Sequence, residues 1–216
     1  MRTLSYYKTC IFDCDGVLLN SNLIKTEAFS ICAKPFGVTA VEALTNYNKI
    51  NGGVSRYKKL KWFFEDYLGK KSEVLYQEAL KKFGNFVHQE LLTCEITPEL
   101  LKLRDTFSEN NWSVVSGGDE KEIRVIFNKR KIDRIFNGGI FGSPLSKHYI
   151  FEKNFNNSNF NRPAVYIGDS QLDYEVSRDF DCDFVFLSEW TELKDWKTFV
   201  KTNKISHRKL LKDLLI

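Results

Sequence analysis

Near its start, the chain reads CIFDCDGVL at residues 10–18, an apolar run that ends in two carboxylates one residue apart and a glycine. The run from Thr9 to Phe12 predicts a short buried strand. Because side chains i and i+2 of a strand point the same way, Asp13 and Asp15 can face one site. In open α/β sheets, ligands bind outside the carboxyl ends of the strands, and both carboxylates are expected there.

The chemistry that suits this pair of carboxylates is phosphoryl transfer. Asp13 would be a nucleophilic carboxylate and Asp15 an acid/base carboxylate, with a hard divalent cation between them and a phosphate. Gly16 frees the backbone just beyond the pair. A plain strand-end turn, in which Asp and Gly are common, is the alternative interpretation of the same residues.

The composition is that of an ordinary globular protein. Of the 216 residues, 43% are hydrophobic and 28% are charged, and no apolar stretch approaches the length of a membrane span. The net charge of +4 is too small to argue for a nucleic-acid partner, but it suits a small anionic substrate. Five scattered cysteines without a CxxC pair indicate free thiols in a reducing compartment, and no secretory signal is expected. We therefore expect a cytoplasmic protein that binds neither nucleic acid nor membrane.

Residues 20–94 contain four helical patterns and no convincing strand. Ser55 and Ser72 can cap two of these helices. An all-helical stretch between two α/β segments predicts an inserted helical domain. The expected division is a core of residues 1–19 and 95–216 and a helical cap of residues 20–94. The four helices are expected at 23–33, at 39–47 with Thr39 as its cap, at 55–69 and at 72–92.

Beyond the insert, strand and helix patterns alternate, as is typical of a parallel sheet covered by helices. Thr97 and Pro98 are expected to begin a helix, as its N-cap and first helical residue. The asparagine-rich stretch 154–161 predicts a loop, and the tail 191–216 predicts an amphipathic helix. Further strands are expected at 112–116, 138–142, 164–167 and 182–187.

Three later strand ends carry polar groups that phosphate chemistry could use. Ser116 and Gly117 offer a hydroxyl and backbone N–H groups at an expected helix start, which could hold phosphate oxygens. Lys147 is a cation near another helix start and could neutralise charge on phosphate and nucleophile. The segment GDSQLD contains Asp169 and Asp173, which could complete an oxygen-rich magnesium site. Singly, each is more often a helix cap or a surface side chain, and only their order along the chain makes them specific.

In this order the motifs resemble those of the haloacid dehalogenase (HAD) superfamily of aspartate-nucleophile hydrolases. The stretch DCDGV at 13–17 is similar to the first motif of that family, Ser116 to the second, Lys147 to the third, and Asp169 with Asp173 to the fourth. The helical insert resembles the cap of the β-phosphoglucomutase and phosphoglycolate phosphatase branch. The resemblance implies an α/β fold, with a Rossmann-like core around a parallel sheet plus an α-helical cap, and a magnesium-dependent phosphotransferase.

The resemblance also implies a role for each residue. Asp13 would attack phosphorus to form an aspartyl-phosphate, while Asp15 would protonate the leaving oxygen and then activate the water that cleaves the intermediate. Magnesium would bind the Asp13 carboxylate, the Asp15 backbone carbonyl and Asp169, with Asp173 as support. Phosphoryl oxygens would be held by Ser116, Gly117 and Lys147. Dehalogenases of this superfamily lack the second aspartate, so Asp15 argues against carbon–halogen chemistry.

Specificity would lie in the cap. The stretch GVSR at 53–56 resembles a stretch of the β-phosphoglucomutase cap, which implies that Arg56 binds a second anionic group of the substrate. An exposed arginine in the first turn of a helix is the alternative. Lys25 stands where the mutase has a histidine that assists its acid/base aspartate, and Gly168 where it has a metal-binding glutamate. Both differences favour a phosphatase over a mutase.

We therefore expect a magnesium-dependent phosphatase that hydrolyses a small phosphorylated metabolite, such as a sugar phosphate, through an aspartyl-phosphate. A phosphosugar mutase with the same nucleophile is the first alternative. A non-catalytic binding protein on the same fold is the second, and it is disfavoured because every catalytic position is filled.

Overall fold

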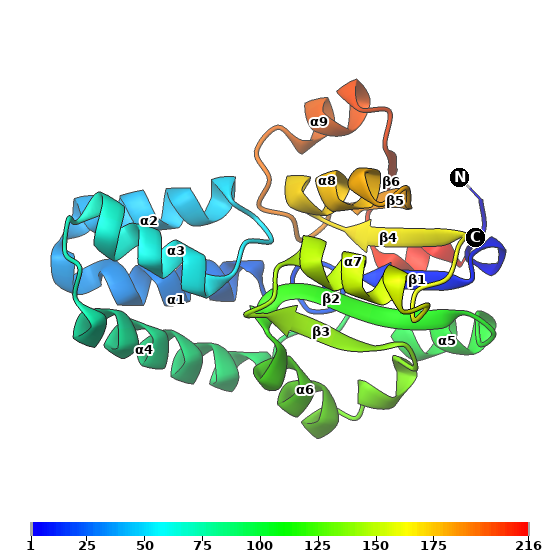
Figure 1. The fold of residues 1–216 in the computed structure, drawn as a ribbon, viewed down its shortest axis with the longest axis horizontal. Helices are drawn as coiled ribbons and strands as arrows, with labels where there is room; N and C mark the ends of the chain where they lie inside the picture. Colours follow the sequence, from blue (N-terminus) through cyan, green and yellow to red (C-terminus); the bar gives the residue numbers. More distant parts are fainter. Residues whose placement is uncertain (1, 216) are drawn as a thin grey trace.

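The computed structural model describes residues 2–215, and a six-stranded parallel sheet lies at its centre. Its strand order is β3-β2-β1-β4-β5-β6, so the strand that precedes Asp13 is central. Figure 1 shows the arrowheads of β3 and β4 pointing toward a separate group of four helices. The strands are β1 (Thr9–Phe12), β2 (Asn111–Asp119), β3 (Gly139–Ser143), β4 (Ala164–Gly168), β5 (Asp183–Leu187) and β6 (Ser206–Arg208).

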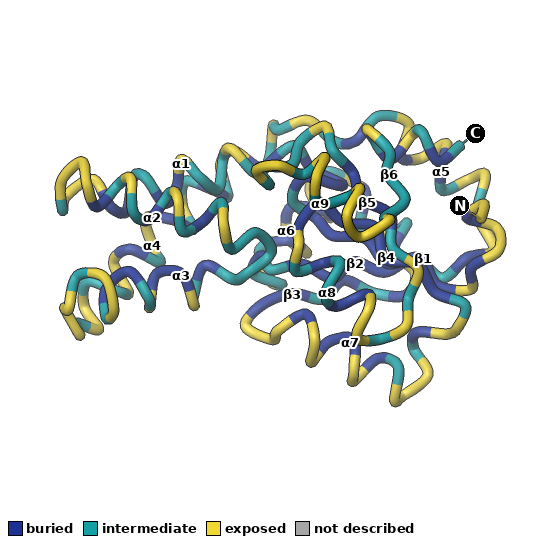
Figure 2. The backbone as a smooth tube through the Cα atoms, turned by 90° about the horizontal axis from the view of Figure 1, so that it is seen from above, coloured by how far each residue is buried: buried dark blue, intermediate teal, exposed yellow. Residues whose placement is uncertain are grey.

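Both faces of the sheet are buried, as expected for parallel strands covered by helices. All four residues of β1 are buried, and alternate side chains enter two different clusters. Cys10 and Phe12 belong to the larger cluster, and Ile11 to the smaller one. Figure 2 shows β1 and β4 among the dark, buried segments at the centre of the core. This burial fixes the position of the carboxylates that follow β1.

Helices from the second half of the chain cover the two faces. The helices α7 (Lys147–Asn156) and α8 (Gln171–Asp179) pack on one face, and α6 (Glu120–Lys129) contacts β2 and β3. Ile123, Ile126 and Phe127 of α6 are buried, as the sequence pattern predicts. Within residues 2–215, none of the helices has the length and apolarity needed to span a membrane. The remaining core helices are α5 (Leu100–Thr106) and α9 (Trp196–Thr202).

The four helices of the insert form a unit beyond the carboxyl ends of the strands, as Figure 1 shows. Phe29 and Phe83 pack together in its centre, with ring centroids 4.6 Å apart and ring planes tilted by 53°. Ser55 and Ser72 cap two of the helices through their side chains, which confirms both sequence predictions. We call this unit the cap. It contains α1 (Asn22–Ala33), α2 (Val38–Ile50), α3 (Arg56–Trp62) and α4 (Glu73–Leu91), with the π-helical turn Phe63–Tyr67 after α3.

The two connections between the cap and the rest of the chain run side by side. Leu19 and Ile96 form an antiparallel bridge. Asn20 N donates to Glu95 O at 2.9 Å, and the Thr97 N–H donates to Leu18 O at the same distance. The connections therefore form a short hydrogen-bonded ribbon.

Several local predictions are wrong. The expected helix at Thr97 and Pro98 begins at Leu100, because the hydrogen bond from Thr97 N holds this residue in the ribbon. Likewise α2 begins at Val38, before Thr39, with Gly37 as its N-cap. The asparagine-rich loop starts late, since α7 continues to Asn156.

The tail is the largest departure from the sequence-based expectation. In place of one amphipathic helix over 191–216 it contains the short helix α9 and the strand β6. Lys204 has a φ of 53°, which turns the chain back toward the sheet. Ser206 then pairs with Val185 of β5, whose backbone groups would otherwise form an unpaired edge.

Candidate active site

The floor of the candidate site is an ion pair between the first and third motifs. Asp13 follows β1 and is 3% exposed, and its Oδ1 lies 3.0 Å from Lys147 Nζ. Lys147 is the first residue of α7, where the Ser146 side chain accepts from Tyr149 N and caps the helix. The fold therefore brings together two residues that are 134 positions apart in the chain (147 minus 13).

The lysine is held in its charged form. Lys147 Nζ donates to Asp173 Oδ1 at 2.5 Å and to the Tyr166 hydroxyl at 3.0 Å. Burial by itself lowers the pKa of Lys147, but Asp13 and Asp173 outweigh burial and raise it above its ordinary value. A buried cation of fixed charge is suited to stabilise phosphoryl oxygens.

Asp173 positions its neighbours through both of its oxygens. Oδ1 accepts from Lys147 and from the Tyr166 hydroxyl, the latter at 2.7 Å. Oδ2 accepts from the Ser170 hydroxyl at 2.7 Å and from the backbone N–H groups of Asp169 and Ser170. These bonds include the capping box of α8. The geometry therefore favours the supporting role of Asp173 over direct binding of a metal ion.

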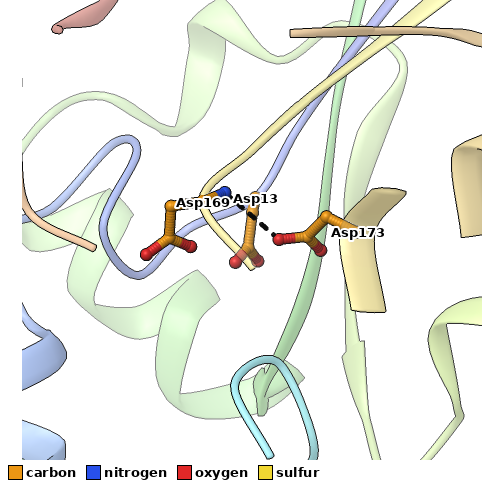
Figure 3. A group of neighbouring side chains, drawn as sticks. All are labelled: Asp13, Asp169 and Asp173. Atoms are coloured by element: carbon orange, nitrogen blue, oxygen red, sulfur yellow. Dashed lines mark hydrogen bonds between the residues drawn. The ribbon is translucent and has the colours of Figure 1, made fainter. Parts of the chain in front are cut away.

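Asp13, Asp169 and Asp173 form a cluster of buried carboxylates. One oxygen of each lies within 4.8 Å of the others, and Figure 3 shows the three side chains side by side. Burial raises the pKa of Asp13 to about 7 despite Lys147, and burial together with Asp13 raises the pKa of Asp169 well above its usual range. A hard divalent cation with oxygen ligands fits this cluster, because it would offset the repulsion of the carboxylates.

Gly16 allows the first and fourth motifs to approach closely. Its φ of +78° is disfavoured for residues with a side chain, and a Cβ atom there would lie 2.2 Å from Asp169 Oδ2. Asn22, the first residue of α1, donates from Nδ2 to the same oxygen at 2.7 Å. Sequence reasoning missed Asn22, since an asparagine at a helix start has no feature that links it to a distant carboxylate.

Asp15 lies in the opposite electrostatic environment from Asp13. Its Oδ1 accepts from the Ser21 hydroxyl at 2.6 Å, and its Oδ2 lies 3.4 Å from Lys25 Nζ. Burial alone would raise the pKa of Asp15, but Lys25 and the Ser21 hydrogen bond lower it below its ordinary value. The structure thus places Lys25 beside Asp15, the residue that the resemblance expects to be the acid/base carboxylate.

The second motif lies inside a strand and not at a helix start. The strand β2 continues through Ser116 and Gly117 to Asp119, whose side chain accepts from Glu122 N and caps α6. The Ser116 hydroxyl is fully buried and accepts from Gly118 N at 2.9 Å. The expectation of a helix start is therefore wrong, although Gly117 lines a cavity between the core and the cap.

A cavity of about 410 Å³ lies between the motifs and the cap. Asp13, Asp15 and Asp169 line it from the core, and cap residues close it from the other side. The loop between α2 and α3 touches the second motif, because a Cβ atom on Gly117 would lie 2.1 Å from Gly53 O. The cap is therefore closed on the core.

Two polar contacts fix this closed arrangement. Arg56, which lines the cavity, forms a 2.5 Å ion pair with Glu122 of α6. The Tyr57 hydroxyl donates to Asp119 Oδ2 at 2.6 Å. The guanidinium of Arg56 already has a carboxylate partner, and its expected binding to substrate remains a prediction.

Comparisons with known proteins agree with this geometry. The sequence pattern described as haloacid dehalogenase-like hydrolase matches residues 10–187. None of the curated proteins matches the chain at a significant level.

Solved structures with the same fold cover nearly all of the chain. A hydrolase from Pseudomonas syringae has a TM-score of 0.74 at 16% identity, covering 96% of each chain. A protein described as a predicted phosphatase, from Clostridium acetobutylicum, has a TM-score of 0.73 at 17% identity, also covering 96% of each chain. A predicted phosphoglycolate phosphatase from Haemophilus somnus reaches 0.67 at 18% identity, over 86% of this chain and 87% of its own. The motifs, the fold and the family match together show that this chain belongs to the haloacid dehalogenase-like hydrolases.

Proposed function

We propose that this protein is a magnesium-dependent phosphomonoesterase that acts on a small phosphorylated metabolite. The observation that carries this proposal is the 3.0 Å contact of Asp13 Oδ1 with Lys147 Nζ, where Asp13 and Asp15 both line the cavity. A carboxylate that attacks phosphorus, a cation for the phosphoryl oxygens and a second carboxylate for proton transfer are the parts such a reaction needs.

The reaction would proceed in two displacements. First, an oxygen of Asp13 attacks phosphorus, the bond from phosphorus to the leaving oxygen breaks, and Asp15 gives that oxygen a proton. Then Asp15 takes a proton from water, the water oxygen attacks phosphorus, and the bond to Asp13 breaks to release inorganic phosphate. Lys147, the Ser116 hydroxyl and the Gly117 backbone N–H would hold the phosphoryl oxygens throughout.

The metal ion would be bound by carboxylate and carbonyl oxygens of three residues. These are the side chains of Asp13 and Asp169 and the backbone carbonyl of Asp15, with Asp173 in support. When bound, the cation would offset the charge of the carboxylates and of the substrate phosphate. Asp13 and Asp169 each place a carboxylate oxygen within 4.8 Å of the other and of Asp173, which fits a cation shared between them.

The environment of Asp15 favours hydrolysis over a mutase cycle. Lys25 Nζ lies 3.4 Å from its carboxylate and lowers its pKa, which stabilises the carboxylate that remains once Asp15 has given its proton to the leaving oxygen. An ionised carboxylate is ready to take a proton from water. A lysine, with its high ordinary pKa, is also a poor proton relay compared with the histidine of the mutase.

The test is release of phosphate from p-nitrophenyl phosphate with and without Mg²⁺. We expect Mg²⁺-dependent turnover in the natural protein and none in Asp13→Asn. Asp181→Asn is the matched control, since the Asp181 side chain is 99% exposed. A folded Asp13→Asn protein with near-normal turnover would refute the assignment of the nucleophile, and a wild-type protein without turnover would refute the proposed function.

A further inference from the structure

The cap contributes a buried cation that the proposed mechanism does not use. Lys59 on α3 is 4% exposed and lines the cavity together with Asp13, Phe29 and Asn48. Its Nζ donates to Asn48 Oδ1 at 2.6 Å, with Asn48 O at 3.4 Å, and lies 5.5 Å from the centre of the Phe29 ring. Lys59 forms no ion pair with any carboxylate of residues 2–215.

A chain of hydrogen bonds fixes the amide that holds Lys59. Asn48 Nδ2 donates to Thr26 Oγ1 at 2.8 Å, and Thr26 Oγ1 donates to Glu192 Oε2 at 2.6 Å. Because its nitrogen is used in this way, Asn48 must present its oxygen to Lys59. The ammonium is therefore held in place by a neutral group, and Glu192 is separated from it by two intervening side chains.

The other cations of the cavity wall have acidic partners. Arg56 pairs with Glu122, Lys25 with Asp15, and Lys49 weakly with Glu192 at 3.9 Å. Lys59 is the exception among these four.

Burial of an ammonium group without an acidic partner is costly, and lysine is rarely buried in this way. Burial lowers the pKa of Lys59 to about 7, although Asp15 and Glu192 act to raise it and Lys25 and Lys147 to lower it. An apolar side chain would fill the same space beside Phe29 at lower cost. The position therefore favours a role in which an anion arrives and offsets the charge.

We propose that Lys59 binds a second anionic group of the substrate, a carboxylate or a phosphate, at the end remote from the phosphoryl group that is transferred. The inference rests on the proposed function and narrows its substrate class to phosphorylated metabolites with an anion at each end. Lys59 stands on the cap wall and Asp13 on the core floor of one cavity, whose volume of about 410 Å³ suits a small metabolite.

The test compares Lys59→Met with Lys58→Met. Methionine keeps the length and apolar stem of Lys59 but removes its charge, and Lys58 is an exposed neighbour on the same helix. One substrate pair, 3-phosphoglycerate against glycerol 3-phosphate, tests the carboxylate, and another, fructose 1,6-bisphosphate against fructose 6-phosphate, tests the phosphate.

In one of these pairs, the wild-type protein should have the higher kcat/KM for the member with the extra anion. In Lys59→Met we expect that preference to fall by about tenfold or more, mainly through KM, since a charge-assisted hydrogen bond is lost. Lys58→Met should keep the preference. No preference in either wild-type pair, or an equal loss for both members of a pair in Lys59→Met, would overturn the proposal.

A second readout separates recognition from a structural role. Removal of an unpaired buried charge should leave the Tm of Lys59→Met unchanged or higher. If that variant does not fold, Lys59→Gln provides the same comparison. Thermal stabilisation by the two members of each pair needs no turnover, so it tests Lys59 even if the wild-type protein fails to hydrolyse p-nitrophenyl phosphate. Equal stabilisation by both members, in wild type and variant alike, would refute the role of Lys59.

Discussion

Asp13 and Asp15 are separated by one residue, yet the protein shifts their pKa values in opposite directions. Burial raises the pKa of Asp13 to about 7, whereas Lys25 and Ser21 lower that of Asp15. A carboxyl group whose pKa is raised by folding destabilises the protein as pH rises from its pKa in the unfolded state to its pKa in the folded state. A carboxyl group whose pKa is lowered by folding stabilises the protein, and this stabilisation is lost as pH falls through its pKa in the folded state. Without a bound cation, Asp13 and Asp169 should therefore destabilise the fold at neutral pH.

Asp169→Asn tests this expectation. At pH 8 without metal, we expect the variant to have a Tm higher than wild type by about 2–4 °C, equivalent to about 1 kcal/mol for a chain of this size. The difference should vanish below about pH 3, where the carboxyl is protonated in both the folded and the unfolded state. Mg²⁺ should raise the Tm of wild type more than that of the variant. Equal stabilisation of both by Mg²⁺ would show that Asp169 does not bind the ion.

Lys147→Met should have the opposite effect on stability. Lys147 Nζ compensates Asp13 and Asp173, and its removal leaves two buried carboxylates without a cation. We expect a loss of about 3–5 kcal/mol in the free energy of unfolding, measured by urea denaturation near pH 7. Lys153→Met, on the exposed face of the same helix, is the control and should stay within about 0.5 kcal/mol.

The element-scale feature of most consequence is the contact of α3 with α6. Arg56 pairs with Glu122, and the Tyr57 hydroxyl donates to Asp119. The N-terminal ends of α3 and α6 are therefore bound to each other. Arg56 can therefore act through Glu122 by keeping the cap closed. The sequence-based hypothesis, in which Arg56 binds substrate directly, makes a different prediction.

A double-mutant cycle of Arg56→Ala and Glu122→Gln separates the two roles. If Arg56 acts through Glu122, each variant should raise KM for p-nitrophenyl phosphate by about threefold to tenfold, and the double variant should be no worse than the more affected single one. If Arg56 instead binds a second anion of the substrate, Arg56→Ala should raise KM for 3-phosphoglycerate selectively and Glu122→Gln should not.

Elements were predictable from the sequence where local chemistry decides them. Ser55 and Ser72 each cap the helix that their position in the sequence predicts. The strand β6 was not predictable, because it forms only by pairing with β5. Thr97 does not cap a helix, because its N–H donates to Leu18 O, far away in the sequence.

The same division applies to the site. The motifs predicted the positions of its carboxylates and of Lys147. Lys59 and Asn22 reach the site through packing between distant segments, which no spacing in the sequence reveals.

At the scale of the whole molecule, the cap and the core are in close backbone contact at Gly53 and Gly117. The Gly53 carbonyl oxygen occupies the space that a side chain on Gly117 would need. Gly117→Ala should therefore prevent full closure of the cap while leaving each unit folded. We expect kcat for p-nitrophenyl phosphate to fall by about tenfold or more, because water is no longer excluded and the site is incomplete.

The control for this variant is Gly84→Ala in α4, whose added Cβ would meet Arg56 Nη1 at 3.6 Å, an ordinary van der Waals contact. It should stabilise the helix by about 0.5–1 kcal/mol and leave kcat unchanged. Small-angle scattering should show a larger radius of gyration for Gly117→Ala alone. An unchanged radius with full activity would contradict the closed arrangement as the working state.

The ribbon formed by the two connections determines how the cap can travel. Two separate single strands would let the cap swivel and twist, but Leu19 and Ile96 are bridged, with hydrogen bonds on either side. Such a strip bends about one axis and resists torsion, so we expect the cap to have a single soft rotational degree of freedom. Each cap residue then follows a fixed arc that ends where Gly53 meets Gly117. Lys59 would return to the same position relative to Asp13 in every catalytic cycle. The distance between the two anionic groups of an acceptable substrate would therefore be fixed.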